Sequence, residues 1–268
     1  RLPRVLLAAA AGANLALGGL LLQAIFRNPL AEPYLLGLSS GGALGAVVAL
    51  AAGAASVTWP ALAGSLALAA IVLLFCRQRI AADLPSLLLV GVALGALAQA
   101  FTTAIILRFD PSALRSILFW LMGSFAGRGW TEVWMLLPAA LVGGLAIWLL
   151  HRPLDLLALG GESAHHLGVR VPLLQTAGIA LAAVLAALTV AACGTIGFVG
   201  LMAPHLTRKL VGAPHGISVP GSMLVGATLT VGADLAARTL LAGTELPVGV
   251  VTGALGCLFF LALVAGKK

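Results

Sequence analysis

Few side chains in this chain are placed to exchange protons across a membrane. Of its eight carboxylates, only Asp234, with Glu245 as a second candidate, lies at the depth of an apolar segment that could span a membrane. The others lie in polar connections or at segment ends. An ion-coupled secondary transporter normally carries carboxylates inside its spans. The distribution argues against that class, which remains the first alternative.

Metal binding and phosphate chemistry also lack a recognisable motif. His165 and His166 are adjacent, so on a helix their rings point in different directions and do not share a metal. Cys76, Cys193 and Cys257 lie in or beside apolar runs without metal-ligand spacing. The chain contains no G-x-x-x-x-G-K-[ST] motif and so has no phosphate-binding loop of its own. We expect no catalytic residue, no metal site and no cofactor bound by this chain.

The composition places the chain in a membrane. Hydrophobic residues make up 61% and charged residues 9%, and the mean hydropathy is +1.13. Soluble domains carry about 25% charged residues, so a soluble core cannot absorb this much apolar surface. Long runs of Ala, Leu, Val and Gly favour packed helices over a β-barrel. The net charge of +7 arises in short loops and indicates membrane topology rather than nucleic-acid binding.

The apolar runs predict an all-α polytopic membrane protein with nine spans. With the C-terminal GKK in the cytoplasm, nine of the 15 basic residues lie on that side, which favours this orientation. Another apolar piece, 112–127, is too short and basic to span and predicts a half-helix or interfacial helix. The predicted spans are 5–26, 38–55, 60–76, 86–107, 131–150, 172–192, 194–212, 219–240 and 246–265.

One stretch breaks the apolar pattern, FRNPLAEPYLLGLSSGGALG at residues 26–45. Pro29 and Pro33 interrupt a helix because they lack backbone donors, and Gly37 lets the chain turn tightly. Irregular backbone at membrane depth is tolerated only where protein or a water-filled path covers it. We expect this stretch to line a path through the protein near its cytoplasmic end.

The longest polar connection, 151–172, predicts two short amphipathic helices joined at Gly160–Gly161. Leu154, Leu156, Leu157 and Leu159 give the first helix a regular apolar face. We interpret the segment as a docking element, because a disordered loop does not need such a face. An ordinary solvated loop is the alternative.

Four blocks of the sequence resemble the FecCD/BtuC family, the permease subunits of type II ABC importers for iron chelates, haem and vitamin B12. The resemblance runs from Arg1 to the C-terminus and implies a BtuC-like helical bundle made by a single permease domain, 1–268. Family members have ten spans, so we expect this chain to lack the first. The blocks are NPLAEPYLLGLSSGGALGA (28–46), LALGGESAHHLGV (157–169), GTIGFVGLMAPHLTRKLVG (194–212) and GADLAARTLLAGTELPVGVVTGALG (232–256).

The resemblance assigns the segment at about 151–172 to the coupling loop that contacts a separate ATPase subunit. Small and apolar residues there suit a packed interface, and Glu162 suits a basic group on the partner. The residues that match the family's coupling pattern are Leu157, Leu159, Gly160, Glu162, Ala164, Leu167 and Gly168.

The resemblance also implies a cytoplasmic gate at Asn28, Leu30, Leu84 and Pro85. Leu84 and Pro85 replace the small hydroxyl residues that the family often has there, which weakens that half of the assignment.

On the opposite side, Arg1, Arg4 and Arg238 match rim arginines that pair with carboxylates of a substrate-binding protein. Interfacial anchoring of Arg1 and Arg4 is the alternative, as is a pair between Arg238 and Asp234 four residues earlier.

The function implied by the resemblance is ATP-driven import across the bacterial inner membrane by alternating access. A permease homodimer would work with two ATPase subunits, which hold ATP and Mg, and with a periplasmic or lipid-anchored binding protein. The chain would contact lipid, bind no nucleic acid and make no covalent bond, so it is not expected to be an enzyme. An iron complex, a ferric siderophore or haem, is favoured as substrate over cobalamin. A truncated inactive permease copy is the second alternative.

Overall fold

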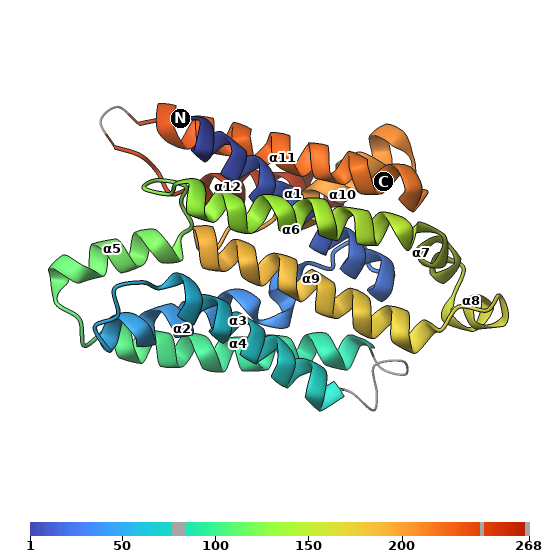
Figure 1. Ribbon diagram of the computed structural model, residues 1–268, viewed down its shortest axis with the longest axis horizontal. Helices are drawn as coiled ribbons and strands as arrows, with labels where there is room; N and C mark the ends of the chain where they lie inside the picture. Colours follow the sequence, from blue (N-terminus) through green and yellow to red (C-terminus); the bar gives the residue numbers. More distant parts are fainter. Residues whose placement is uncertain (77–83, 242–243, 266–268) are drawn as a thin grey trace.

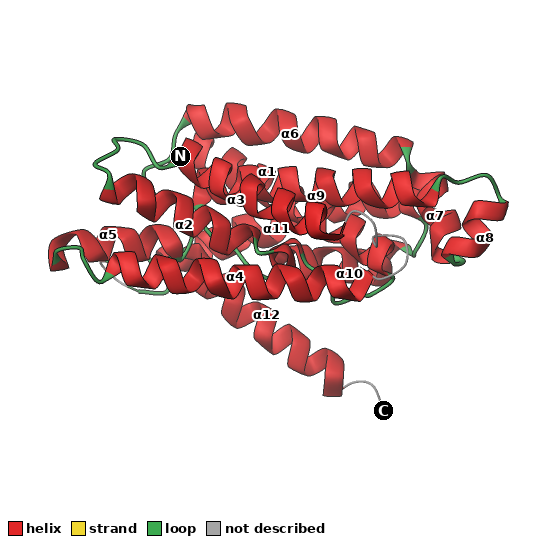
Figure 2. Cartoon of the chain, turned by 90° about the horizontal axis from the view of Figure 1, so that it is seen from below, coloured by secondary structure: helices red, strands yellow, loops and turns green. Residues whose placement is uncertain are grey.

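The computed structural model describes residues 1–76, 84–241 and 244–265, and this part of the chain consists of helices and connections without a strand (Figure 2). The helices are α1 (Leu2–Phe26), η1 (Pro33–Leu36), α2 (Leu38–Ala51), α3 (Thr58–Cys76), α4 (Leu84–Ile106), α5 (Pro111–Leu121), α6 (Trp130–Leu149), α7 (His151–Ala158), α8 (Gly161–His166), α9 (Val171–Cys193), α10 (Val199–Val211), α11 (His215–Thr239) and α12 (Val248–Ala265).

Helix α1 is the centre of the bundle. Its apolar window is 83% buried, against 22% for the corresponding window of α4. It packs against α6, α9, α10 and α11, while α9 also contacts α2 and α3 and so joins the two groups of helices (Figure 1). Helix α1 therefore forms the protein core, and α4 presents an apolar surface suited to lipid or to another chain.

Small residues let the central helices touch backbone to backbone. A Cβ atom added to Gly19 would lie 1.8 Å from the carbonyl oxygen of Gly200, and one added to Gly12 would lie 2.1 Å from that of Gly226. Neither position has room for a side chain. The absence of a Cβ therefore sets the separation of α1 from α10 and from α11.

All nine predicted spans contain a helix, but the helices differ in length. Six are long and apolar enough to cross a membrane by length and composition: α1, α3, α4, α6, α9 and α11. Helices α2 and α12 are shorter apolar helices, and α10 has 13 residues with Arg208 and Lys209 in its last turn. Nine crossings remain a prediction. Helix α5 confirms the short helix expected within 112–127.

The two ends of the bundle carry different elements. One end, which we call the α7/α8 end, holds these two short helices beside the end of α1 and the start of α11 (Figure 1). The other, which we call the N-terminal end, holds Arg1, the last turn of α11 and α5 (Figure 1). Helix α12 extends obliquely from the bundle (Figure 2).

Candidate gate, coupling and docking sites

The broken stretch begins where α1 ends. Arg27 adopts a left-handed conformation, with φ 47° and ψ 37°, and its N–H caps the last turn of α1. The Asn28 side-chain oxygen then accepts a hydrogen bond from the Leu30 N–H at 2.9 Å. This local bond is typical of an Asn-stabilised turn. Asn28 and Leu30 are both exposed at the α7/α8 end, and their role in a gate remains a prediction.

The second half of the predicted gate lies at the start of α4. The backbone of Leu84 and Pro85 begins that helix, but their side chains lie outside the described residues. Their contact with Asn28 and Leu30 therefore remains a prediction.

Two hydrogen bonds connect the broken stretch to a second irregular segment, which lies between α9 and α10. The Phe198 N–H donates to Oε1 of Glu32 at 2.7 Å, and the Ile196 N–H donates to the Tyr34 hydroxyl at 3.0 Å. Phe198 is the N-cap of α10, with φ 68°, and its own side chain supplies no acceptor. The carboxyl group of Glu32 therefore satisfies the start of a helix 166 residues away.

Burial raises the pKa of the Glu32 carboxyl to about 7, and the hydrogen bond from Phe198 opposes this change. Sequence reasoning placed Glu32 in a loop and missed this role. The available signal was a pair of interrupted segments of which only the first contains a carboxylate, Glu32.

Gln23 and Arg208 connect α1 to α10 closer to the α7/α8 end. Gln23 Nε2 donates to the carbonyl oxygens of Gly200, at 3.2 Å, and Leu201, at 3.4 Å. Its Oε1 accepts a hydrogen bond from Arg208 Nη2. Together with the Gly19–Gly200 contact, these bonds make α1 and α10 one packed unit.

The coupling loop forms the two short helices predicted, and its residues divide into inward and outward sets. Leu157 is 2% exposed and Ala164 is fully buried, so both anchor the loop on the bundle. Leu159 and Leu167 are 67% and 59% exposed. The regular Leu face that predicted docking therefore packs against the bundle at Leu157, and a partner protein would contact other residues of the loop. These are Leu159, Glu162, Leu167 and Gly168, with Gly160 partly exposed.

A contact between Asp155 and His215 holds the predicted coupling loop against α11. Asp155 Oδ1 lies 2.6 Å from His215 Nδ1 and accepts the His215 backbone N–H at 2.9 Å. His215 is the first residue of α11, so the carboxylate also lies at the positive end of that helix. The sequence alone gave no reason to pair these residues, which are 60 positions apart.

The three predicted docking arginines lie near one another at the N-terminal end, but two are already paired. Arg4 contacts Asp234 at 2.8 Å and Glu245 at 3.0 Å. Arg238 Nε lies 3.3 Å from Asp234 Oδ2, which is the intrahelical pair named above as an alternative. Arg1 is exposed and has no ion pair within the described residues. The docking assignment itself remains a prediction.

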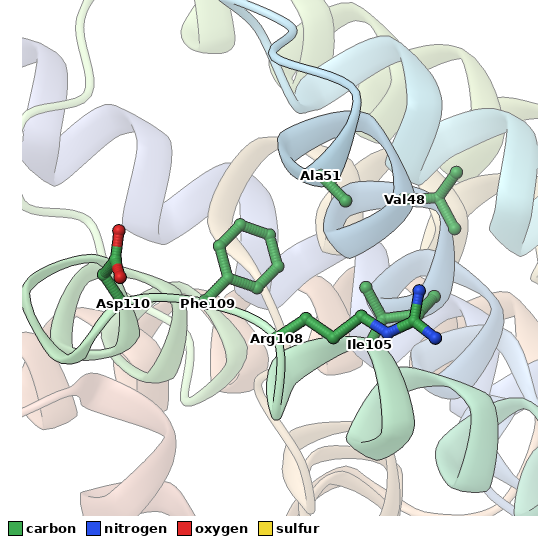
Figure 3. A pocket seen from close by; sticks show the side chains of 6 residues that line it. All are labelled: Val48, Ala51, Ile105, Arg108, Phe109 and Asp110. Atoms are coloured by element: carbon green, nitrogen blue, oxygen red, sulfur yellow. The ribbon is translucent and has the colours of Figure 1, made fainter.

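A cavity of about 500 Å³ opens at the same end, between α2, the end of α4 and the start of α5. Figure 3 shows the Phe109 ring directed toward Ala51, while the side chains of Arg108 and Asp110 extend in different directions. Within the described residues, no group of three or more His, Cys, Asp or Glu side chains is placed to hold a metal. The cavity has charged edges without a catalytic arrangement.

Known proteins match nearly the whole chain. Residues 1–266 match the model of the FecCD transport family. The vitamin B12 import system permease protein BtuC of Shigella sonnei is 40% identical over 276 residues, which cover 100% of this chain and 83% of that protein. The protein of the same name from Escherichia coli O1:K1 / APEC gives the same identity and coverage.

Solved structures show the same architecture. One, described as an inward-facing conformation of a metal-chelate type ABC transporter, matches with a TM-score of 0.90 and 38% identity, over 99% of this chain and 85% of that chain. The structure of PsaBC from Streptococcus pneumoniae in complex with Fab matches with a TM-score of 0.66 and 14% identity, over 97% of this chain and 89% of that chain. The second likeness concerns the fold alone.

Proposed function

Because the chain belongs to the FecCD transport family, as a permease subunit of the ABC importer type, we propose that it moves vitamin B12 inward across the bacterial inner membrane by alternating access. The observation that supports this substrate is 40% identity, over the whole chain, to permeases named for vitamin B12 import. An iron complex, which the sequence alone favoured, becomes the second candidate. It is supported by the 38% identity to a transporter described as metal-chelate type.

We propose that movement of the ATPase subunit is transmitted to the permease at the α7/α8 end. The exposed coupling residues Leu159, Glu162 and Leu167 contact an ATPase subunit, which binds ATP and Mg in a separate chain. Movement of that subunit displaces the coupling loop, and the Asp155–His215 pair transmits the displacement to α11. A second copy of the permease completes the path between the two chains. Nucleotide drives the cycle because it binds the inward and outward states with different affinities.

We propose that the substrate-binding protein docks at the N-terminal end. Arg1 is the arginine most available to its carboxylates, since Arg4 and Arg238 are paired within the chain. Opposite charges across such an interface contribute mainly orientation and association rate. The gate formed with Asn28 and Leu30 lies at the other end of the bundle, so entry and exit are controlled by separate segments.

The test is uptake into proteoliposomes that contain this permease and its ATPase subunit, with vitamin B12, ferric siderophore or haem supplied with its binding protein. We expect ATP-dependent accumulation of vitamin B12 and none with ADP inside. Accumulation of an iron complex instead would assign the second substrate. Uptake driven by an ion gradient without ATP would contradict the proposal, as would no uptake by a permease that fails to bind the ATPase subunit.

A further inference from the structure

A second, smaller cavity lies at the α7/α8 end, and the function proposed above assigns no ligand to it. It measures about 260 Å³ and lies between the end of α1, the end of α7, α10 and the start of α11. Its polar lining comes from Gln23, Arg27, Arg208 and His215, and Pro29 and Ala158 also line it. The cavity therefore combines two guanidinium groups with a volume that admits several waters or one phosphate group.

Arg208 has no counter-charge within the described part of the chain. Its Nη2 donates to Oε1 of Gln23, a neutral acceptor, and it forms no ion pair there. The Gln23 amide is held in this orientation, because its Nε2 donates to the carbonyl oxygens of Gly200 and Leu201. A guanidinium has five N–H donors, so most of those on Arg208 are left for another acceptor.

Arg27 lines the same cavity from the end of α1. Its Nη1 lies 3.7 Å from the position that a Cβ atom would take on Gly160, so the side chain reaches the coupling loop. No hydrogen bond or ion pair of its side chain occurs among the described residues. The carbonyl groups at the end of α1 provide only a partial negative charge.

The acidic residue of this region is already engaged. Asp155 contacts the ring and the backbone N–H of His215, at 2.6 and 2.9 Å. It holds the coupling loop and forms no ion pair with Arg27 or Arg208. Among the described residues, two positive groups therefore line one cavity without an unengaged anion, which is unfavourable for Arg208 because its charge is partly removed from water.

We propose that this cavity binds a phosphate group through Arg27 and Arg208. Guanidinium groups match phosphate oxygens well because their planar donors form paired, charge-assisted hydrogen bonds. The phosphate belongs either to the headgroup of an anionic lipid or to a soluble phosphate compound. The α7/α8 end faces the cytoplasm under the function proposed above, and both sources are present on that side. The binding site itself depends on the cavity and not on transport.

The experiment measures binding to the purified permease in nanodiscs, without substrate or ATP. Inorganic phosphate is titrated at constant ionic strength, with chloride as the replaced ion, and the midpoint of thermal unfolding is followed. A second titration varies phosphatidylglycerol against phosphatidylcholine in the disc. A saturable rise with inorganic phosphate indicates a soluble ligand, and a rise with phosphatidylglycerol alone indicates a lipid headgroup.

Three variants decide whether the cavity is responsible. Arg27→Gln removes an exposed charge and leaves the Gln23–Arg208 contact in place, and Arg208→Gln removes the other guanidinium. Lys209→Gln is the matched control, since this exposed residue is adjacent to Arg208 in sequence but does not line the cavity.

We expect the apparent affinity for phosphate to fall about tenfold or more in the two arginine variants and to stay unchanged in the control. Absence of stabilisation in the wild type by either ligand, or equal loss in all three variants, would overturn the proposal. If Arg208→Gln does not fold, Arg27→Gln alone gives the answer.

Discussion

Arg4 and Asp234 are 230 residues apart in sequence, yet the guanidinium of Arg4 donates three hydrogen bonds to the carboxylate of Asp234. Nη2 of Arg4 lies 2.8 Å from Oδ1, and Nε lies 3.1 Å from both carboxylate oxygens. The Asp234 side chain is 3% exposed and also contacts Arg238. One carboxylate therefore pairs with two arginines and connects the start of α1 to the last part of α11.

The first prediction concerns this carboxylate. Asp234→Asn should lower the free energy of unfolding by about 3 kcal/mol, because it leaves two partly buried arginines without their shared counter-charge. Glu245→Gln is the control, since Glu245 contacts the same Arg4 but its side chain is 48% exposed. Its effect should stay below about 1 kcal/mol. Thermal unfolding in detergent measures both, and equal losses would refute the assignment of Asp234 as the central residue.

A second prediction separates the unpaired rim arginine from the paired ones. Arg1→Glu should slow association of the binding protein and weaken the dependence of the association rate on salt, because Arg1 is exposed. The fold should be unaffected. Surface plasmon resonance at several salt concentrations measures the rate, with Arg128→Glu as a charge-matched control. Unchanged kinetics in Arg1→Glu would show that docking uses other residues.

The third prediction concerns Glu32 and pH. The pKa of its carboxyl is about 7 in the folded protein against 4.5 as the ordinary value, so the folded state favours the protonated form. The corresponding contribution to stability is complete below pH 4.5 and is lost as the pH rises through about 7. The unfolding midpoint of the wild type should therefore fall between pH 5 and pH 8.

Two variants test that assignment. Glu32→Gln keeps an acceptor for the Phe198 N–H and should remove this part of the pH dependence. Glu32→Ala removes the acceptor and should cost about 1–2 kcal/mol at low pH, as loss of a helix cap does, and this cost should shrink as the pH rises because the variant lacks the titrating carboxyl. A pH slope that persists in Glu32→Gln would assign it to another group.

The fourth prediction uses the two sides of the coupling loop. Leu159→Asp and Leu167→Asp change exposed residues and should reduce ATPase-driven transport while leaving the permease folded. Leu157→Asp and Ala164→Asp bury a charge and should prevent folding. Co-purification with the ATPase subunit and the unfolding midpoint distinguish the two effects. Transport at wild-type level in Leu159→Asp and Leu167→Asp would exclude these residues from the contact.

The sequence predicted the position of the helices because hydropathy and helix-breaking residues act locally. Each predicted span contains a helix, and the short helices α5, α7 and α8 lie where Pro, Gly and charged residues interrupt the apolar runs. Two lengths differ from the predicted spans: α10 begins only at Val199, after the irregular segment that opens the span predicted for 194–212, and α2 ends at Ala51 and not at 55. A hydropathy window extends across such segments and cannot locate the first helical turn.

The side-chain partners were mostly unpredictable because they join distant parts of the chain. Glu32 with Phe198 and Asp155 with His215 are separated by 166 and 60 residues, and no local pattern connects them. The Arg238–Asp234 contact was foreseen because it follows helical spacing. The inward turn of Leu157 was missed, since an amphipathic face shows that a surface is covered but not by which partner.

The fastening of α1 at both of its ends limits how this protein can change shape. Over 25 residues the helix is about 37 Å long, and it is tied to α11 through Arg4 and to α10 through Gln23 and the Gly19–Gly200 contact. Because α1 is bonded to its neighbours at both ends, it cannot shorten or bend without breaking these bonds. Motion that keeps these bonds therefore moves α1, α10 and α11 together as one unit relative to the periphery, where α4 has little buried surface and α12 extends from the bundle (Figure 2).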